Sequence, residues 1–377
     1  MIKELILITI GNPYLLETWS GVPYFLTKEL RNRDIIVNVI DLEPNRYIKI
    51  LYNVIILPLT SLFVKNGELS IYRSIFFRIY QKITFKRKLK KYNNADAIIG
   101  LSYNLMIPSN GKPIVLLSDW PFSYTLEKKG ITPGFYQRTH IKWDINCLKN
   151  ATHIISIFPT CSQYINKIIE ENKAISLGVN VINNKSAEPD ERIIENKSKH
   201  KRIVFIGRLH YLEGLLILLQ SYKELKEIHP ELCIDIIGMN KSDIEGQNIE
   251  LHEGVNFWGY LDKGNNEECE KYYNILNNAS LYVNTTPGWV GYTSMIEAMY
   301  FYTPVIVYPC KEFIDEFGVN INFGRYCDNR KDLANIITNI YVDNNEFRKL
   351  CINAHNRVSE YTWENYVNRL LNTIEYI

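Results

Sequence analysis

Two charged side chains stand where parallel strands would present them to a ligand. Arg208 follows an apolar run, 203–206, and Gly207. At a strand end its guanidinium can hold a phosphate through two parallel hydrogen bonds, although a surface arginine without a ligand is the alternative. Glu297 lies among apolar residues in the first turn of a predicted helix, 294–302. Its carboxylate can accept two sugar hydroxyl protons, or it only complements the helix dipole.

The loop in front of that helix adds backbone donors. The stretch 282–307 reads as a strand end, a loop, the helix and a short strand, and its loop contains Gly291, Tyr292 and Thr293. A helix N-terminus attracts anions, and doubly wound sheets bind ligands beyond the carboxyl ends of their strands. We therefore predict that this loop contributes to a binding site.

The elements that would position these residues alternate between strand and helix along all 377 residues. Such alternation indicates an α/β protein with parallel sheets and helices on both faces. In the first half we predict strands at 5–10, 35–41, 97–100, 113–117 and 153–157, and helices at 21–32, 74–92, 139–150 and 159–171. In the second half we predict strands at 202–206, 233–237, 255–258, 281–283 and 304–307, with a helix at 267–278.

A polar stretch separates the two halves. Residues 183–201 are charged and nearly free of apolar side chains, which is typical of a linker or of a surface loop at a domain boundary. We predict two Rossmann-like domains, 1–182 and 202–360, that face each other across a cleft.

Motifs in the second half resemble the large retaining glycosyltransferase family with the GT-B fold, the glycosyltransferase family 4-like or "glycosyl transferases group 1" proteins. The matching residues are Glu297, Ala298, Met299, Pro304, Val305 and Ile306 in one motif, and Gly207, Arg208, Leu209 and Gly214 in another. The resemblance covers most of residues 170–377 and the N-terminal half more loosely. It implies that 361–377 is a helix that returns to the first domain.

The resemblance also implies roles for particular residues. Arg208 and Gly207 would hold the diphosphate of a nucleotide-sugar donor, and Glu297 would hold its ribose. In the first domain, Gly21 would bring backbone amides to the donor phosphate. The family transfers the sugar with retention of anomeric configuration and works without a metal, so no cofactor is expected.

The nucleobase is expected against the segment Trp258, Gly259 and Tyr260, which follows a predicted strand. In the family, backbone groups at these positions contact the base. An aromatic ring there can also stack on it, which is worth roughly 1–3 kcal/mol by analogy with nucleic-acid binding. For Trp258, packing in the core is the alternative.

Two positions depart from the family pattern. Trp289 stands where the family has its first glutamate, near the transferred sugar, and Glu213 stands where it has a lysine for the diphosphate. Either another cation such as Lys241 or Lys311 replaces that lysine, or the donor carries less phosphate charge. The identity of the nucleotide stays open between UDP, GDP, ADP and CMP.

In the first half, Asp119 follows the predicted strand 113–117. It can orient an acceptor hydroxyl or act as a general base, and the alternative is that it caps the following turn. His140 is a lone histidine on a predicted helix and carries no prediction.

A basic stretch in the first half predicts contact with an anionic membrane. Residues 73–91 contain eight cations and no acid, at a spacing that gives a helix an apolar face. The candidate membrane-interface residues are Arg78, Lys82, Lys86, Arg87 and Lys90. RNA binding and a merely solvated basic face are alternatives, but no nucleic-acid motif accompanies the stretch. The apolar segment 47–64 is predicted as a helix on the sheet or at a membrane surface, with a membrane span as the alternative.

Composition fits an intracellular protein. The chain is 46% hydrophobic and 22% charged, and its seven cysteines are scattered singly, which argues against a disulfide framework. The apolar run at the N-terminus reads as a buried strand rather than a signal peptide. We expect a bacterial, cytoplasmic protein that is peripheral on the inner face of the cell membrane.

Together these observations predict a glycosyltransferase that moves a sugar from a nucleotide-sugar donor to a cell-envelope glycan or a lipid-linked acceptor, as in capsule or lipopolysaccharide synthesis. Two alternatives stay open: a sugar-nucleotide epimerase of the same architecture, and a binding protein without catalysis.

Overall fold

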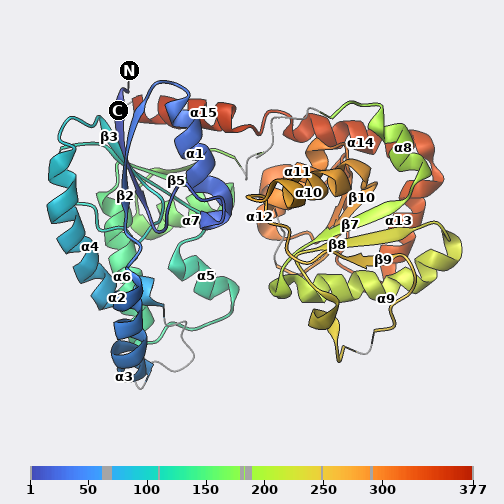
Figure 1. Cartoon of the computed structure of the whole chain (residues 1–377), viewed down its shortest axis with the longest axis horizontal. Coiled ribbons are helices and arrows are strands. Elements are labelled where there is room, and N and C mark those ends of the chain that lie inside the picture. The colour runs from blue at the N-terminus through green and yellow to red at the C-terminus, as the bar shows by residue number, and fades with distance from the viewer. Residues whose placement is uncertain are drawn as a thin grey trace. The chain divides into compact units, whose positions relative to one another are not determined.

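The protein, seen in a computed structural model, is built from two compact units (Figure 1). Unit 1 comprises Met1–Gly178 together with Tyr366–Ile377, and unit 2 comprises Val179–Asn365. The structure describes residues 2–61, 70–108, 111–178, 182, 189–247, 249–288 and 292–375.

Unit 1 is organised around a six-stranded sheet in which all neighbouring strands are parallel. The spatial order is β2 (Ile36–Asp41), β1 (Glu4–Thr9), β3 (Ala97–Gly100), β4 (Ile114–Ser118), β5 (His153–Ser156) and β6 (Ala174–Ser176). Most strand residues are fully buried, because a parallel sheet is covered on both faces and so reads as continuous apolar sequence. The order reverses between β1 and β3, which is where sheets of this type bind ligands.

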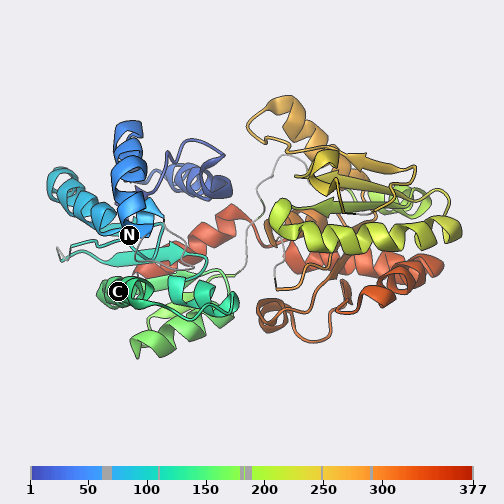
Figure 2. The same ribbon diagram turned by 90° about the horizontal axis from the view of Figure 1, so that it is seen from below.

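The helices of unit 1 lie on both sides of its sheet (Figure 2). They are α1 (Val22–Arg31), α4 (Ile75–Lys88), α5 (Phe122–Lys128), α6 (Phe135–Asn150), α7 (Pro159–Ile169) and the last residues of α15 (Trp363–Glu375). The end of α15 is fixed to unit 1 by hydrogen bonds: Arg33 donates to the Asn368 side chain at 2.9 Å, and Arg369 donates to the Leu177 carbonyl at 3.2 Å.

One helical segment of unit 1 is mostly exposed. Helix α2 (Arg46–Leu51), a π-helical turn (Tyr52–Ile56) and α3 (Leu57–Ser61) follow one another without a break. No residue of α2 is buried, and Tyr52 is the buried residue of the π-helical turn. The prediction of a helix from Tyr47 is confirmed as far as Ser61, and residues 62–64 lie outside the described residues.

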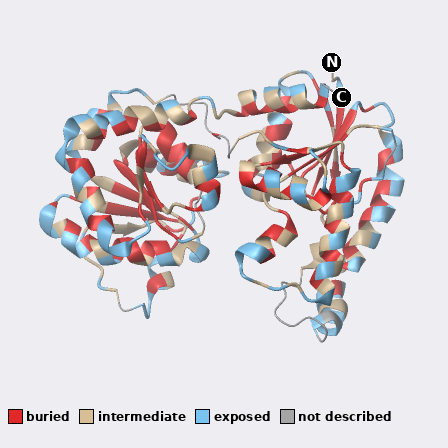
Figure 3. Ribbon diagram, turned by 180° about the vertical axis from the view of Figure 1, so that it is seen from behind, coloured by how far each residue is buried: buried red, intermediate tan, exposed pale blue. Residues whose placement is uncertain are grey.

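Unit 2 holds a second parallel six-stranded sheet, in the order β12 (Gly324–Tyr326), β11 (Val305–Val307), β10 (Leu281–Asn284), β7 (Arg202–Ile206), β8 (Cys233–Ile237) and β9 (Val255–Phe257). In Figure 3 the strands at the centre of each unit are buried and the outer helices carry the exposed residues. The helices of unit 2 are α8 (Ile193–Lys199), α9 (Leu212–Ile228), α10 (Asn266–Asn278), α11 (Tyr292–Tyr300), α12 (Lys311–Phe317), α13 (Leu333–Val342) and α14 (Asn344–Val358).

Helix α8 lies within the range that composition predicted as a linker. Its Lys197 is fully buried, and the Lys197 ammonium donates to the carbonyls of Leu276 (3.1 Å) and Phe301 (2.5 Å) and to the Thr303 hydroxyl (2.7 Å). Burial lowers the pKa of Lys197 to about 7. Carbonyls near helix ends are suitable partners for a buried cation. Part of the predicted linker is therefore a helix that Lys197 anchors in unit 2.

Among the described residues, no helix has both the length and the apolar character that crossing a membrane requires.

Candidate functional site

Three glycines meet at the carboxyl ends of β7, β8 and β9. The Gly207 amide donates to the Ile237 carbonyl at 3.0 Å, and the Gly238 amide donates to the Gly259 carbonyl at 2.7 Å. A side-chain carbon on Gly238 would lie 2.6 Å from the Gly207 carbonyl oxygen, so the backbone here tolerates only glycine. The three main-chain segments therefore approach one another closely at this edge of the sheet. The sequence predicted Gly207 and Gly259 but missed Gly238, although it directly follows a predicted strand.

Arg208 extends from this edge. It is exposed, and its guanidinium lies 5.0 Å from the centre of the Tyr260 ring, which is itself 58% exposed. The contact joins the loop after β7 to the loop after β9, and both side chains stay open to solvent. A cation held on an aromatic face can still donate from the edge of its guanidinium, which suits a phosphate.

Glu297 is in the opposite situation, since its side chain is only 1% exposed and its carboxylate has four donor contacts. Lys263 Nζ lies 2.8 Å from Oε1 and 2.6 Å from Oε2. The Tyr272 hydroxyl donates to Oε2 at 2.8 Å, and the Tyr273 hydroxyl donates to Oε1 at 3.1 Å. Burial raises the pKa of both tyrosines, and the Glu297 charge raises it further, so both hydroxyls keep their protons.

These four contacts occupy the acceptor positions of the carboxylate. A sugar hydroxyl can reach Glu297 only by replacing one of the donors. Lys263 is a donor with access to solvent, since 28% of its side chain is exposed, and it lies in a loop rather than in a helix. The sequence predicted Glu297 but not its partners, although the adjacent tyrosines of α10 were a signal, since one of two consecutive helical aromatics often faces inward.

One loop connects the two predicted donor-binding residues. Within residues 259–265, Tyr260 contacts Arg208 and Lys263 contacts Glu297. Both side chains are thus linked through the same segment of unit 2. The cleft predicted between the two domains stays a prediction.

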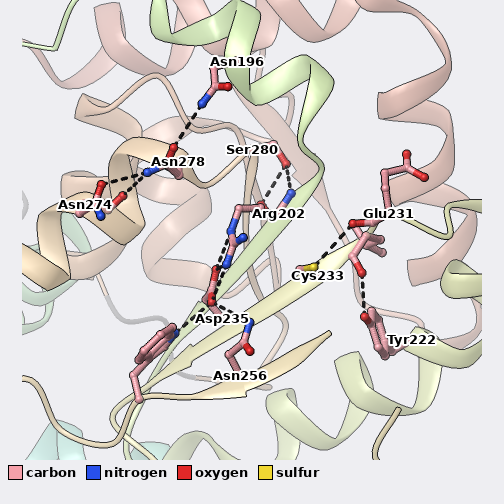
Figure 4. Close-up of polar contacts among 12 residues, drawn as sticks. Asn196, Arg202, Tyr222, Glu231, Cys233, Asp235, Asn256, Asn274, Asn278 and Ser280 are labelled. Atoms are coloured by element: carbon pink, nitrogen blue, oxygen red, sulfur yellow. Dashed lines mark hydrogen bonds and ion pairs between the residues drawn. The ribbon is translucent and has the colours of Figure 1, made fainter. Parts of the chain in front are cut away.

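Trp258 has a structural role in the sheet. Its indole N–H donates to Asp235 Oδ1 at 2.9 Å, and the Lys271 ammonium lies 4.1 Å from its ring centre. Asp235 is buried on β8 and also accepts hydrogen bonds from Arg202 and Asn256, as Figure 4 shows. The alternative of packing therefore has structural support for Trp258, and stacking on a base stays a prediction.

Unpaired polar atoms line the segment after β10. Asn284 and Thr285 are buried, and among the described residues their Nδ2 and Oγ1 atoms find no hydrogen-bond partner. The first turn of helix α9 lies next to this segment: a side-chain carbon placed on Gly214 would be 2.2 Å from the Thr286 hydroxyl. Buried donors without partners beside a helix N-terminus favour a polar ligand or ordered water at this position.

The unexpected Glu213 is paired. Arg330 donates to the Glu213 carboxylate at 3.0 Å, so a cation stands beside the position where the resemblance led us to expect a lysine. Of the two substitutes suggested by the sequence, Lys311 forms an ion pair with Asp315 at 2.6 Å. Lys241 lies in a short 3-10 helix, Lys241–Ile244.

The loop residues before α11 are only partly described. Trp289 and Gly291 lie outside the described residues. Tyr292 is the first residue of α11; it is buried, packs on the Phe313 ring at 5.5 Å between centroids, and lies next to Cys310 with its hydroxyl 3.7 Å from the sulfur. Thr293 is half-buried. The position of Tyr292 is therefore that of a packing residue.

In unit 1, Asp119 follows β4 and meets a tryptophan from the loop after β1. The Trp19 indole N–H donates to Asp119 Oδ2 at 3.1 Å. Burial raises the pKa of Asp119 to about 6, and the hydrogen bond from Trp19 works against this rise. A half-buried carboxyl with a pKa near neutrality is suited to accept a proton.

The backbone that carries Trp19 is strained. Trp19 (φ 40°) and Ser20 (φ 54°) both have left-handed conformations, and Gly21 follows at φ 82°. Each such non-glycine residue costs roughly 1–3 kcal/mol and is found mostly at functional positions. Gly21 was predicted to contact the donor phosphate, and this role stays a prediction; the structure assigns it the start of α1.

Not all of the predicted membrane-interface residues of the basic stretch are exposed. Lys82, Lys86, Arg87 and Lys90 are exposed, as a membrane interface requires. Arg78 is not: only 11% of its side chain is exposed, it binds Asp144 at 3.2 Å, and it lies over the Trp143 ring at 4.3 Å. Arg78 is therefore corrected to a structural residue, since a buried carboxylate attracts the cation inward.

Comparisons with known proteins agree on the architecture. Residues 200–343 match the family model described as Glycosyl transferases group 1. Sucrose-phosphate synthase from Thermosynechococcus elongatus superposes with a TM-score of 0.70 at 16% identity, covering 99% of this chain and 98% of that chain. Anabaena HepE, in complex with UDP and glucose, gives 0.60 at 15% identity and covers 100% of both chains.

A third similar structure covers less. The S. aureus TarM mutant in complex with fondaparinux, alpha-GlcNAc-glycerol and UDP has a TM-score of 0.53 at 18% identity, over 74% of this chain and 56% of that chain. The search of curated proteins finds no match. At these identities the structural likenesses establish the fold.

The fold and the matched domain together define a glycosyltransferase of the GT-B type. Residues 200–343 match the Glycosyl transferases group 1 model, so the resemblance seen in the sequence and the predicted α/β, GT-B fold are confirmed.

Proposed function

We propose that this protein transfers a sugar from a nucleotide-sugar donor to a glycan or lipid-linked acceptor of the cell envelope, with retention of configuration and without a metal. The observation that supports the proposal is the edge of the unit 2 sheet, where the closely packed Gly207, Gly238 and Gly259 stand beside the exposed Arg208. UDP is the first nucleotide to test, because the TarM and HepE structures contain it.

Arg208 supplies the main electrostatic contribution in this proposal. Negative charge grows on the leaving phosphate as the glycosidic bond breaks, and a fixed cation stabilises that charge. Gly21 adds backbone amides, and Arg330 stands beside Glu213 in place of the expected lysine. The leaving phosphate then helps to deprotonate the acceptor.

Glu297 holds the ribose in this proposal, after the hydroxyls displace Lys263. Asp119 orients the acceptor hydroxyl or accepts its proton, which its pKa of about 6 supports. Exposed cations hold the protein on an anionic membrane surface at the cytoplasmic face: Lys82, Lys86 and Arg87 of α4, and Lys90 of the 3-10 turn that follows it.

A donor screen tests the proposal. UDP-, GDP-, ADP- and CMP-sugars are added to the folded protein, and thermal shift and nucleotide release are measured. A ligand that binds the native state raises the melting temperature. Arg208→Ala should abolish the shift, while Arg192→Ala, another exposed arginine, should not. If no nucleotide shifts the melting temperature of the wild type, the proposal is wrong.

The products decide between the proposal and its alternatives. Sugar released or transferred from the nucleotide indicates transfer, an isomerised free nucleotide sugar indicates an epimerase, and binding without turnover indicates a binding protein.

A further inference from the structure

The helical segment from α2 to α3 presents apolar side chains to solvent. Its exposed apolar residues are Tyr47 (81%), Ile50 (48%), Leu51 (47%), Val54 (68%), Ile55 (50%) and Leu59 (59%). They recur three or four residues apart, so they form one stripe along the helix, which we name the apolar helix face. A surface helix normally turns such a stripe towards the core.

The segment is attached to unit 1 beside α4. Tyr52 is buried, and its ring lies 6.3 Å from that of Phe76 near the start of α4. In the part of the chain that the structure describes, this packing leaves the apolar helix face exposed. A contiguous exposed apolar surface on a folded protein marks an interaction site.

Helix α4 continues the same kind of surface. Its Ile75, Ile79 and Ile83 are 58%, 55% and 47% exposed, and they are spaced four residues apart. Exposed cations follow along the helix at Lys82, Lys86, Arg87 and Lys90, and neither 46–61 nor 70–91 contains an acidic residue. The surface is thus apolar at one end and strongly positive at the other.

This charge pattern selects among possible occupants. If the same face of a second copy paired with it, the cations of two α4 helices would be brought together, and like charges destabilise such a symmetric contact. An anionic bilayer offers negative headgroups to the cations and an acyl region to the apolar stripe.

We propose that the apolar helix face inserts into the interfacial region of an anionic membrane, with α4 lying on the headgroups beside it. An interfacial helix lies flat, with its apolar side about 5–10 Å below the headgroup boundary. The 16 residues of the segment give it a length of about 24 Å along the surface. This inference rests on the proposed function, because it assigns the membrane-contacting element of the transferase.

The test compares two double variants of equal charge. Val54→Glu/Leu59→Glu places carboxylates on the apolar helix face, and Val319→Glu/Val342→Glu places them on unit 2 at side chains that are 68% and 74% exposed. All four positions are well exposed, so we expect both proteins to fold. Co-sedimentation is measured with vesicles of phosphatidylglycerol and phosphatidylcholine, and with vesicles of phosphatidylcholine alone.

We expect the wild type and the unit 2 variant to bind the mixed vesicles, and this binding should weaken in high salt. The apolar-face variant should bind the same vesicles at least about tenfold more weakly. Equal binding by both variants overturns the insertion. Absence of wild-type binding at low salt overturns it too, and binding to phosphatidylcholine alone that equals binding to the mixed vesicles overturns the anionic requirement.

Insertion depth gives a second readout. A tryptophan introduced by Val54→Trp should be quenched by brominated lipid, and one introduced by Val342→Trp should not add to the quenching of the native tryptophans. Self-association of the wild type that is lost in the apolar-face variant, without vesicle binding, would assign the surface to a second copy and overturn the proposal. Sugar transfer to a soluble acceptor should be the same in both double variants; if no variant transfers sugar, the proposed function fails independently of vesicle binding.

Discussion

Glu297 lies in helix α11 of unit 2, and Asp119 directly follows strand β4 of unit 1. Both are carboxylates, and their surroundings are opposite in kind. Glu297 has an ammonium and two tyrosine hydroxyls as donors. Asp119 has the Trp19 indole as its donor from a side chain, and burial raises its pKa to about 6. Several donors hold the Glu297 carboxylate in place, whereas Asp119 has one side-chain donor and a raised pKa that allows it to take up a proton.

This difference suggests a division of work. A saturated carboxylate that a ligand must enter by displacement is suited to recognising hydroxyls, because the binding geometry is already fixed. A carboxyl group with a pKa near neutrality changes its charge under physiological conditions, which is suited to proton transfer.

Replacing Glu297 with Gln should give the largest loss. Two hydrogen bonds from the ribose to a charged acceptor are each worth about 1.5–3 kcal/mol, so we expect kcat/KM to fall about 100-fold or more. Lys263 also loses its counter-ion, so the melting temperature should fall. Glu346→Gln, which removes a half-exposed surface carboxylate, is the control. Unchanged transfer by folded Glu297→Gln protein would remove Glu297 from the donor site.

Replacing Asp119 with Asn should lower kcat about tenfold and remove a limb of the pH profile. Wild-type activity should rise with pH through about 6, as Asp119 loses its proton. A wild-type profile that is flat from pH 5 to 7.5, or a limb that persists in the variant, would contradict a role for Asp119 in proton transfer.

The same group predicts how stability depends on pH. The pKa of Asp119 is about 6 in the folded protein, above its ordinary value of 3.8, so between these values the folded state holds a proton that the unfolded state has lost. Stability from this group is therefore present at about pH 4 and is lost as the pH rises to 6, above which the group has no further effect on stability. Asp119→Asn should remove this component, which urea titrations at pH 4.5 and 7 would measure.

Replacing Lys263 with Met should tighten donor binding by about fivefold, because a hydroxyl then reaches Glu297 without displacing an ammonium. The variant should also be less stable, since a buried carboxylate loses its cation. Tyr272→Phe provides the comparison: it removes a donor that is fully enclosed, so it should lower stability without tightening binding. Weaker binding by Lys263→Met would mean that Lys263 itself contacts the donor.

Sequence and structure agree best where elements are mostly apolar and buried. Strands β3, β7 and β8 have the predicted boundaries, because runs such as 97–100 are buried on both faces and cannot be anything else in an alternating chain. Strands β6 and β12 were missed. Each has three residues at a sheet edge, which is too short for periodicity to show.

The high charge of 183–201 led to the prediction of a linker, of which the structure describes 189–201. Lys197 looked like a solvated residue of a linker, but three acceptors from distant parts of unit 2 surround its ammonium. The partners of Glu297 in the candidate site were also not predictable from local sequence. Glu297 could be found from its motif, whereas Lys263, 34 residues earlier, has no local pattern that ties it to the carboxylate. Contacts between residues far apart in sequence are made by the fold, and a single sequence does not contain them.

The hydrogen bond from Trp19 to Asp119 can be tested by itself. Trp19→Phe removes the indole donor while keeping an aromatic ring, and that donor works against the effect of burial on Asp119. The pKa of Asp119 should therefore rise, and the acidic limb of the activity profile should move up by about half a pH unit. In the Asp119→Asn background the same substitution should move nothing, because the two residues act as a pair. A limb that moves in both backgrounds would show that Trp19 acts on another group, and a limb that moves in neither would show that the indole does not set the charge of Asp119.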